Sequence, residues 1–162
     1  KGREIIFLIR PMEMDFTQGT RRFFAYQEDE LIGFIFFDPV YEDGRVIGYV
    51  PNISRASEKF PQGIFYPLMA HAFETFKKEG IPFIFLGLSP LALDYPPEEF
   101  ESGVLRWMLE FTSRHFNFLY NFKGIDFTKS RFRGKEEPTY ALHKYKVPVK
   151  GFTAMFRLCN VI

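Results

Sequence analysis

The stretch Tyr49–Leu91, YVPNISRASEKFPQGIFYPLMAHAFETFKKEGIPFIFLGLSPL, decides how the rest of the chain is interpreted. It begins with a strand-like run and passes through a polar turn, Asn52–Gly63. An amphipathic helix and a second apolar run follow. A helix start exposes backbone N–H groups and a partial positive charge, so an anion can bind there. The stretch predicts a strand–helix–strand unit with a candidate anion site at Gln62–Gly63.

The helix is predicted from Ile64 onward by the spacing of its apolar residues. They recur three and four positions apart on one face: Ile64, Phe65, Leu68, Met69, Ala72, Phe73 and Phe76. Lys77 and Lys78, followed by Gly80, are typical of a helix end. The continuous apolar run Phe83–Leu88 predicts a central strand buried on both faces, reached by a parallel crossover.

Upstream of this unit, the pattern predicts an antiparallel meander. Four apolar runs are expected to form strands: Glu4–Ile9, Arg21–Tyr26, Leu31–Phe37 and Val46–Ile53. The short polar segment Gln27–Glu30 predicts one hairpin, and Asp43–Gly44 predicts the next. Asp38–Pro39 is expected to end the strand before that second turn.

Downstream of Leu91, the chain alternates between helical and strand-like patterns. Tyr95–Glu99 predicts a helix start, because proline and acidic residues suit the first turn. The later expected elements are a strand at Phe116–Phe122, a short helix at Gly124–Phe132, a strand at Tyr140–Tyr145 and a helix within Val149–Ile162. The whole order predicts an α+β fold with a mixed, mostly antiparallel sheet and helices on both faces.

The composition indicates an ordinary globular protein, with 46% hydrophobic and 25% charged residues among 162. The net charge of +1 gives no overall argument for nucleic-acid or membrane binding. Cys159 is the only cysteine, which rules out an internal disulfide and fits a cytoplasmic setting. No apolar run reaches the roughly 18 residues of a membrane span. We expect one domain over residues 1–162, the C-terminal part of a longer chain, because Lys1 begins almost inside a strand-like segment.

Two polar clusters are candidates for chemistry. In the turn, Arg55 supports the backbone N–H groups near Gly63 as an anion site, although a plain connection would need the same glycine. Further on, Lys123, Lys129 and Arg131 alternate with aromatic residues. They suit the phosphates of a nucleic acid or lipid headgroup, and a solvated basic face is the alternative.

No nucleophile or metal site stands out. His71, His115 and His143 have no metal-ligand spacing, and Ser89 and Cys159 lack the surroundings of a catalytic nucleophile. We expect no metal. An enzyme that positions two substrates, so that one attacks the other, needs neither feature.

Several short segments carry a family resemblance through their order and spacing. They are Asn52–Arg55 (NISR), Pro61–Gly63 (PQG), Leu86–Leu91 (LGLSPL), Phe122–Ile125 (FKGI), Lys129, Arg131–Phe132 and Glu137–Tyr140 (EPTY). Together they resemble the soluble C-terminal domain of the lysylphosphatidylglycerol synthases, the multiple peptide resistance family. The resemblance covers approximately Asn52 to Leu142.

The resemblance implies a GNAT-like fold, that of the acyl-CoA N-acyltransferases. It also implies transfer of an aminoacyl or acyl group to a hydroxyl or amine acceptor. The donor would be aminoacyl-tRNA or acyl-CoA, with no tightly bound cofactor. The acceptor would be an anionic phospholipid at the inner face of the membrane.

The same resemblance distributes roles among the candidate residues. Donor phosphates would lie near Arg55, Gln62 and Gly63, and the acceptor or the tRNA end would meet Lys123, Lys129 and Arg131. Tyr140 would donate a hydrogen bond or assist proton transfer, and Asn52 stands where the family carries an aspartate. That exchange leaves a second hypothesis open, a non-catalytic GNAT-scaffold module that binds lipid or an anionic ligand. A third is a nucleic-acid binder that uses the basic run alone.

Overall fold

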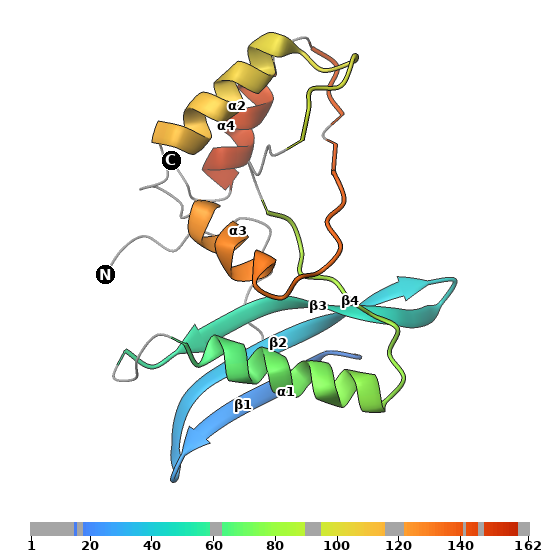
Figure 1. Cartoon of the computed structure of the whole chain (residues 1–162), viewed down its shortest axis with the longest axis vertical. Coiled ribbons are helices and arrows are strands. Elements are labelled where there is room, and N and C mark those ends of the chain that lie inside the picture. Colours follow the sequence, from blue (N-terminus) through green and yellow to red (C-terminus); the bar gives the residue numbers. More distant parts are fainter. Residues whose placement is uncertain are drawn as a thin grey trace. The chain divides into compact units, whose positions relative to one another are not determined.

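The computed structural model describes residues 15, 18–58, 63–89, 95–115, 122–140, 142–145 and 148–158. The chain divides into two compact units (Figure 1). Residues 9–87 form the first, here called the sheet unit, and residues 1–8 with 88–162 form the second, the helical unit. Three predictions lie outside the described residues: the strand at Glu4–Ile9, residues 116–121 of the strand expected at Phe116–Phe122, and the candidate residue Gln62. Phe122, the expected end of that strand, instead begins a helix.

The sheet unit contains a four-stranded mixed sheet in the order β1-β2-β3-β4. The strands are β1 (Arg21–Gln27), β2 (Glu30–Glu42), β3 (Arg45–Ala56) and β4 (Phe83–Ile84). The first three are antiparallel neighbours, and β4 joins β3 in parallel after the helix α1 (Phe65–Lys78). The predicted meander and the parallel crossover are therefore confirmed. The fold is α+β, and its assignment as GNAT-like stays a prediction.

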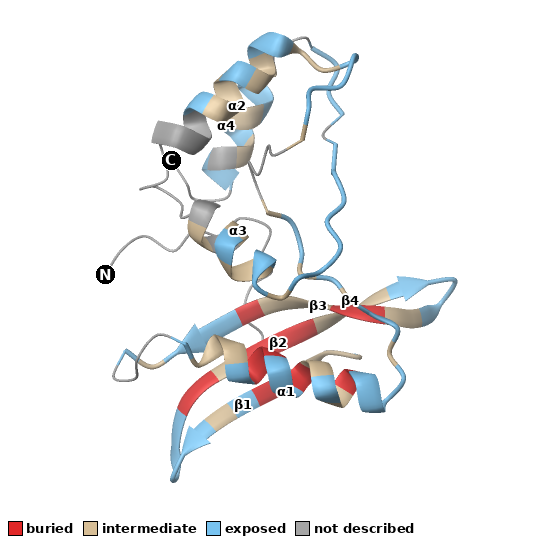
Figure 2. Cartoon of the chain, viewed as in Figure 1, coloured by how far each residue is buried: buried red, intermediate tan, exposed pale blue. Residues whose placement is uncertain are grey.

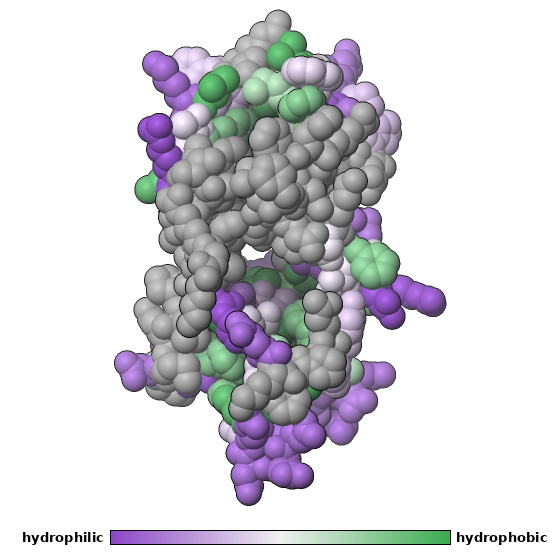
Figure 3. Space-filling model, turned by 90° about the vertical axis from the view of Figure 1, so that its left-hand side faces the viewer, coloured by the Kyte–Doolittle hydropathy of each residue, from purple (hydrophilic) through white to green (hydrophobic). Residues whose placement is uncertain are grey.

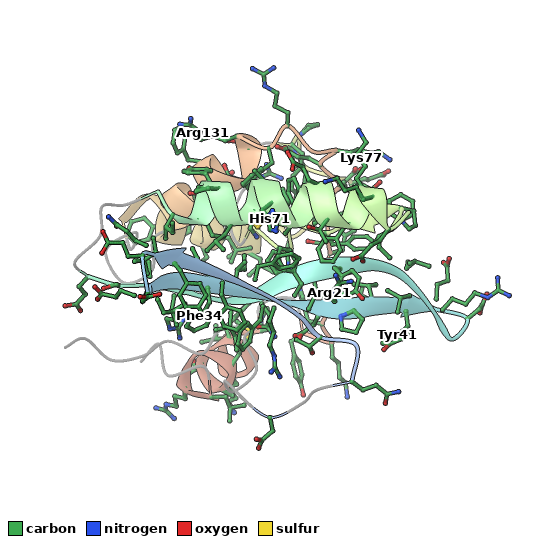
Figure 4. The ribbon with its side chains drawn as sticks, turned by 90° about the horizontal axis from the view of Figure 1, so that it is seen from below. Arg21, Phe34, Tyr41, His71, Lys77 and Arg131 are labelled. Carbon is green, nitrogen blue, oxygen red and sulfur yellow. The ribbon has the colours of Figure 1, made fainter. Side chains whose placement is uncertain are left out.

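An aromatic core lies between the sheet and α1. Phe76 of α1 stacks on Tyr49 at 4.5 Å between ring centroids, and it meets Phe37 and Phe23 edge-on at 5.2 and 5.5 Å. Such pairs stabilise a core beyond the area that they bury. The buried residues therefore concentrate in the strands and on the sheet-facing side of α1 (Figure 2). Figure 4 shows His71 on this helix above the sheet, with Phe34 on the opposite face.

The end of α1 follows the predicted basic residues and glycine. Gly80 adopts a φ of 75°, which favours glycine, and its N–H donates to the carbonyl of Lys77. The N–H of Ile81 donates to the carbonyl of Phe76, which completes a Schellman motif. Glu79 at the C-cap accepts two hydrogen bonds from Arg21, at 2.5 and 2.7 Å, which tie the helix end to β1.

Three expectations for the sheet unit are wrong. β2 does not end at Asp38–Pro39 but continues to Glu42. Pro39 is tolerated because it pairs with β3 only, in a part of β2 beyond the end of β1, so no ladder bond needs its missing N–H. Asn52 and Arg55 belong to β3 rather than to a turn.

The third wrong expectation is the central strand predicted at Phe83–Leu88. β4 covers only Phe83–Ile84 and lies at the edge of the sheet, with Phe83 57% exposed. It approaches β3 closely, because a Cβ on Gly48 would stand 2.6 Å from the carbonyl oxygen of Phe83. Gly87, with φ 75°, then turns the chain away from strand geometry.

The helical unit contains α2 (Gly103–His115), α3 (Phe122–Ser130) and α4 (Val149–Leu158). The short helix near Gly124–Phe132 and the C-terminal helix are thus confirmed. None of the residues of this unit whose burial is described is fully buried. No helix in the described ranges is long and apolar enough to cross a membrane.

Two expectations for the helical unit are wrong. The helix predicted from Tyr95 begins only at Gly103, because Ser102 accepts the N–H of Leu105 as an N-cap, whereas Pro96 and Pro97 favour extended backbone before them. Tyr140 and residues 142–145, expected in a strand, are exposed and irregular. No described strand pairs with these residues. A strand needs a neighbouring strand to accept and donate its backbone hydrogen bonds, so the apolar pattern alone does not make this segment a strand.

Candidate functional site

The candidate donor site lies where the parallel pairing between β3 and β4 ends. Gly48 pairs with Phe83 and Tyr49 with Ile84, and the N–H of Phe85 then donates to the carbonyl of Tyr49 at 2.8 Å. β3 continues to Ala56, still paired with β2. Among the described residues of the sheet unit, the pairing of β4 with β3 therefore ends at Tyr49, and the later part of β3 lies at the sheet edge.

A β-bulge marks the same part of β3. Phe37 pairs with Pro51 and Phe36 with Ile53, so Asn52 is an extra residue with no direct partner on β2. Bulges bend a strand and redirect side chains, and they are over-represented beside active sites. The bulge therefore presents the Asn52 side chain out of the regular ladder.

Asn52 forms a polar pair with Asp38 of β2. Its Nδ2 donates to Oδ2 of the half-buried Asp38 carboxylate at 2.5 Å, and Asp38 Oδ1 accepts weakly from Thr20 at 3.4 Å. Phe37 packs on α1, so the alternation along β2 places Asp38 on the opposite face of the sheet. Oδ1 of Asn52 is buried and has no hydrogen-bond partner among the described residues. A buried unpaired acceptor is costly, and this one is suited to an N–H or O–H from a ligand.

Arg55 and the start of α1 lie beside one another. Arg55 lines a hollow of about 100 Å³ together with Phe34, Ser54, Ala56, Ile64, Phe65 and Leu68. Gly63 precedes the helix with φ 134°, and the N-cap residue Ile64 provides no side-chain cap. The structure thus brings Arg55 and Gly63, two of the predicted donor residues, to the same end of the sheet unit. The hollow itself is mainly apolar.

Lys129 of the helical unit makes a side-chain hydrogen bond within that unit. From the last turn of α3, its Nζ donates to the carbonyl of Leu88 at 2.6 Å. Burial lowers the pKa of Lys129, and the nearby Asp126 carboxylate raises it by a smaller amount. Lys129 is therefore hydrogen-bonded to the backbone just after Gly87. The role of Lys129 as a phosphate ligand stays a prediction.

The other predicted residues of the helical unit are spread over α3 and the segment after it. Arg131 follows α3 and lies over the Phe127 ring, 5.7 Å from the centroid. Lys123 lies in the first turn of α3, and its side chain is outside the described part. Tyr140 is half exposed and meets Phe100 edge-on at 5.6 Å. Among the described residues, no group of three or more His, Cys, Asp or Glu is placed to hold a metal ion.

Asp38 is the residue of this site that the sequence analysis missed. Asp38–Pro39 was interpreted only as a strand end. Counting back from the Asp43–Gly44 turn would pair Asp38 with Tyr49, but bulges shift the register, so that Asp38 pairs with Val50 and reaches Asn52 diagonally. An aspartate inside a strand was the available signal, since that residue type is depleted there.

This α+β architecture, with a polar pair at a bulge beside an interrupted parallel pairing, can now be compared with known proteins. The chain belongs to the family described as "Phosphatidylglycerol lysyltransferase, C-terminal", which it matches over residues 1–143. An uncharacterized protein of Corynebacterium glutamicum is 25% identical over 157 residues. That alignment covers 91% of this chain and 20% of the relative, so the chain spans about a fifth of the relative's length. No solved structure matches the chain.

Proposed function

We propose that this chain is a transferase domain that moves an aminoacyl or acyl group from an activated donor to a phospholipid hydroxyl. In the reaction, the acceptor oxygen attacks the carbonyl carbon of the donor ester or thioester. A new ester bond forms as the bond to the tRNA 3′-oxygen or the CoA sulfur breaks. The acceptor proton passes to that leaving atom.

Membership in the phosphatidylglycerol lysyltransferase family over residues 1–143 carries the proposal. The geometry of the sheet unit supports it in two respects. Among the described residues, the pairing of β4 ends while β3 continues, so the later part of β3 has no described neighbour on the side where an extended donor would pair. The uncapped start of α1 and Arg55 lie at the same end and offer donors for phosphate oxygens.

The pair of Asn52 and Asp38 places a carboxylate at the site where Asn52 alone would offer only a neutral amide. An amide takes up no proton near neutral pH, but Asp38 is in direct contact with it and carries a carboxylate. Asn52 Oδ1 would accept a hydrogen bond from the amino group of the donor or the hydroxyl of the acceptor. Asp38 would then stabilise positive charge on that group. Tyr140 remains the proposed proton-assisting residue from the helical unit.

A second candidate function is a binding module without turnover. The contact between Asn52 and Asp38 favours it, because the amide that stands in place of an acid is already engaged by its neighbour. Such a module would bind the donor or the lipid and release it unchanged.

Donor binding and turnover by the purified chain distinguish the two functions. Labelled aminoacyl-tRNA and acyl-CoA are titrated against the wild type, Arg55→Ala and Lys129→Ala. Arg45→Ala is the matched control, because this exposed residue lies at the other end of β3 and loses the same charge. Removing a phosphate contact should weaken donor binding roughly 10-fold, a loss of about 1.4 kcal/mol, while the control stays unchanged.

Equal donor affinity in all four proteins would overturn the assignment of the donor site. Donor binding without any product, measured over many half-lives of the donor complex, would replace the transferase by the binding module. Product formation that depends on Arg55 or Lys129 supports the transferase.

A further inference from the structure

The C-terminal part of the chain has a charge pattern unlike the rest. Glu137 is the last acidic residue, whereas Lys144, Lys146, Lys150 and Arg157 follow it. Four of the 21 cations and none of the 20 acids thus lie in residues 138–162. This segment carries +4 and the preceding residues −3, an asymmetry that the net charge of +1 conceals.

Three cations of this segment, Lys144, Lys150 and Arg157, belong to the described residues and are exposed. Lys150 and Arg157 of α4 are exposed and make no ion pair with any residue that the structure describes. Together with Ala154, which is also exposed, they are spaced as i, i+4 and i+7, so they share one stripe of the helix. Phe152 and Met155 are less exposed and lie on another side of α4. The helix therefore presents a basic face outward.

Large apolar side chains of the same part of the chain are also exposed. Leu142 is 97% exposed, Tyr145 67% and Leu158 80%. Lys144 Nζ lies 6.0 Å from the centroid of the Tyr145 ring, and Arg157 immediately precedes Leu158. Figure 3 shows hydrophobic side chains at the surface of the end of the helical unit that holds α2 and α4. Exposed apolar residues beside cations are typical of peptides that lie in the headgroup region of a bilayer.

We propose that this surface, residues 142–145 with α4, docks the chain on a bilayer that contains anionic phospholipid. The cations meet the headgroup phosphates, and Leu142, Tyr145 and Leu158 enter the boundary between headgroups and acyl chains. A nucleic acid would satisfy the cations but offers no apolar layer for the two leucines. Most of this surface, Lys144, Tyr145 and α4, lies beyond the family match, which ends at residue 143 and includes Leu142. The inference rests on the proposed function, because it brings the domain to a lipid acceptor.

Vesicle flotation tests the docking surface. The wild-type chain is mixed with vesicles of phosphatidylcholine alone or with phosphatidylglycerol added, in the absence of any donor. The test variant is Lys150→Glu with Arg157→Glu. Its matched control is Lys77→Glu with Lys78→Glu, which reverses two exposed cations of α1; Figure 4 shows Lys77 pointing away from the sheet.

The wild type and the control should float with the vesicles that contain phosphatidylglycerol and not with pure phosphatidylcholine. Each cation near an anionic surface contributes about fivefold, so the test variant should bind roughly 30-fold more weakly or worse. Raising the ionic strength should weaken wild-type binding, because the attraction is screened. Leu142→Ser, which leaves every charge in place, should also weaken binding.

Three results would overturn the proposal: equal binding to both vesicle types, full binding by the Lys150 and Arg157 variant, or equal loss in the α1 control. If these two residues bind tRNA while the vesicles stay unbound, the surface is a nucleic-acid site instead. The proposed function fails separately. Flotation without any transfer activity would contradict only the transferase, and transfer to detergent-dispersed lipid without flotation would contradict only the docking surface.

Discussion

Replacing Asn52 with aspartate places a second carboxylate against Asp38 at the β3 bulge. In the wild type, the amide donates to the carboxylate at 2.5 Å. A hydrogen bond to a charged group contributes about 1.5–3 kcal/mol. In Asn52→Asp that donor is lost, and two like charges occupy a half-buried site within hydrogen-bond distance of each other.

Protonation of one carboxyl group limits how much free energy of unfolding this substitution can remove. The folded variant can keep one carboxyl protonated, which then donates to the other and replaces the amide. Holding an ordinary aspartic acid protonated at pH 7 costs about 4 kcal/mol, since its unperturbed pKa is about 3.9 and each unit is worth about 1.36 kcal/mol. We therefore expect Asn52→Asp to lower the free energy of unfolding by about 2–4 kcal/mol at pH 7. The ceiling falls to about 1.5 kcal/mol at pH 5 by the same arithmetic.

The sign of the pH dependence follows from proton binding. The folded variant holds a proton that the unfolded chain has released, so the stability of the variant rises as pH falls through this window. Urea unfolding at pH 7 and pH 5 measures both quantities. Ser54→Asp, a control on the same strand, adds one charge away from Asp38 and should change stability by less than about 1 kcal/mol.

Exchanging the two residues completes the test. Asp38→Asn combined with Asn52→Asp restores one amide and one carboxylate, and should recover most of the loss as a coupling energy of the double-mutant cycle. If Asn52→Asp is as stable as the wild type at pH 7, or if the exchange recovers nothing, the polar pair does not exist in solution as described.

Three further substitutions test the packing of the sheet unit by urea unfolding. Gly48→Ala should cost about 1–3 kcal/mol, because its Cβ would stand 2.6 Å from the backbone oxygen of Phe83; a loss near zero would mean that β4 does not pair there. Phe76→Ala, at a fully buried site, should cost about 3–5 kcal/mol, and a smaller loss than at an exposed position would refute the aromatic core. Glu79→Gln should cost about 0.5–1 kcal/mol at pH 7, because the hydrogen bond from Arg21 lowers the pKa of this partly exposed glutamate. A lowered pKa stabilises the fold fully above the unfolded pKa near 4.5, so this difference should shrink as pH falls below 4.5 and disappear below the folded pKa of Glu79; a constant difference would contradict the ion pair.

The elements of the sheet unit were predictable where local chemistry decides them. The Asp43–Gly44 turn specifies a hairpin without long-range information, and the spacing of the apolar residues in α1 specifies a helix in the same way. The extent of the strands was not predictable, because it depends on pairing. Pro39 remains in β2 only because β1 ends before it, and the Phe83 run lies at a sheet edge that its apolar composition does not reveal.

In the candidate site, too, features set by local sequence were predictable and features set by strand pairing were not. Gly63 was a candidate because a glycine before a helix is a local pattern. Arg55 was assigned to the same turn but lies in β3, at the same end of the sheet unit as the start of α1. Asp38 was missed because its contact with Asn52 depends on bulges that displace the register. Such displacements arise from the fit of three strands, which no short motif encodes.

Single-turnover transfer tests the proposed function most directly. The purified chain, in excess over donor, is mixed with vesicles that contain phosphatidylglycerol and with either aminoacyl-tRNA or acyl-CoA that carries a labelled acyl group. We predict that label from one of these donors appears in the lipid phase and that Arg55→Ala combined with Lys129→Ala abolishes most of it. A folded chain that transfers no label from either donor would contradict the assignment as a transferase.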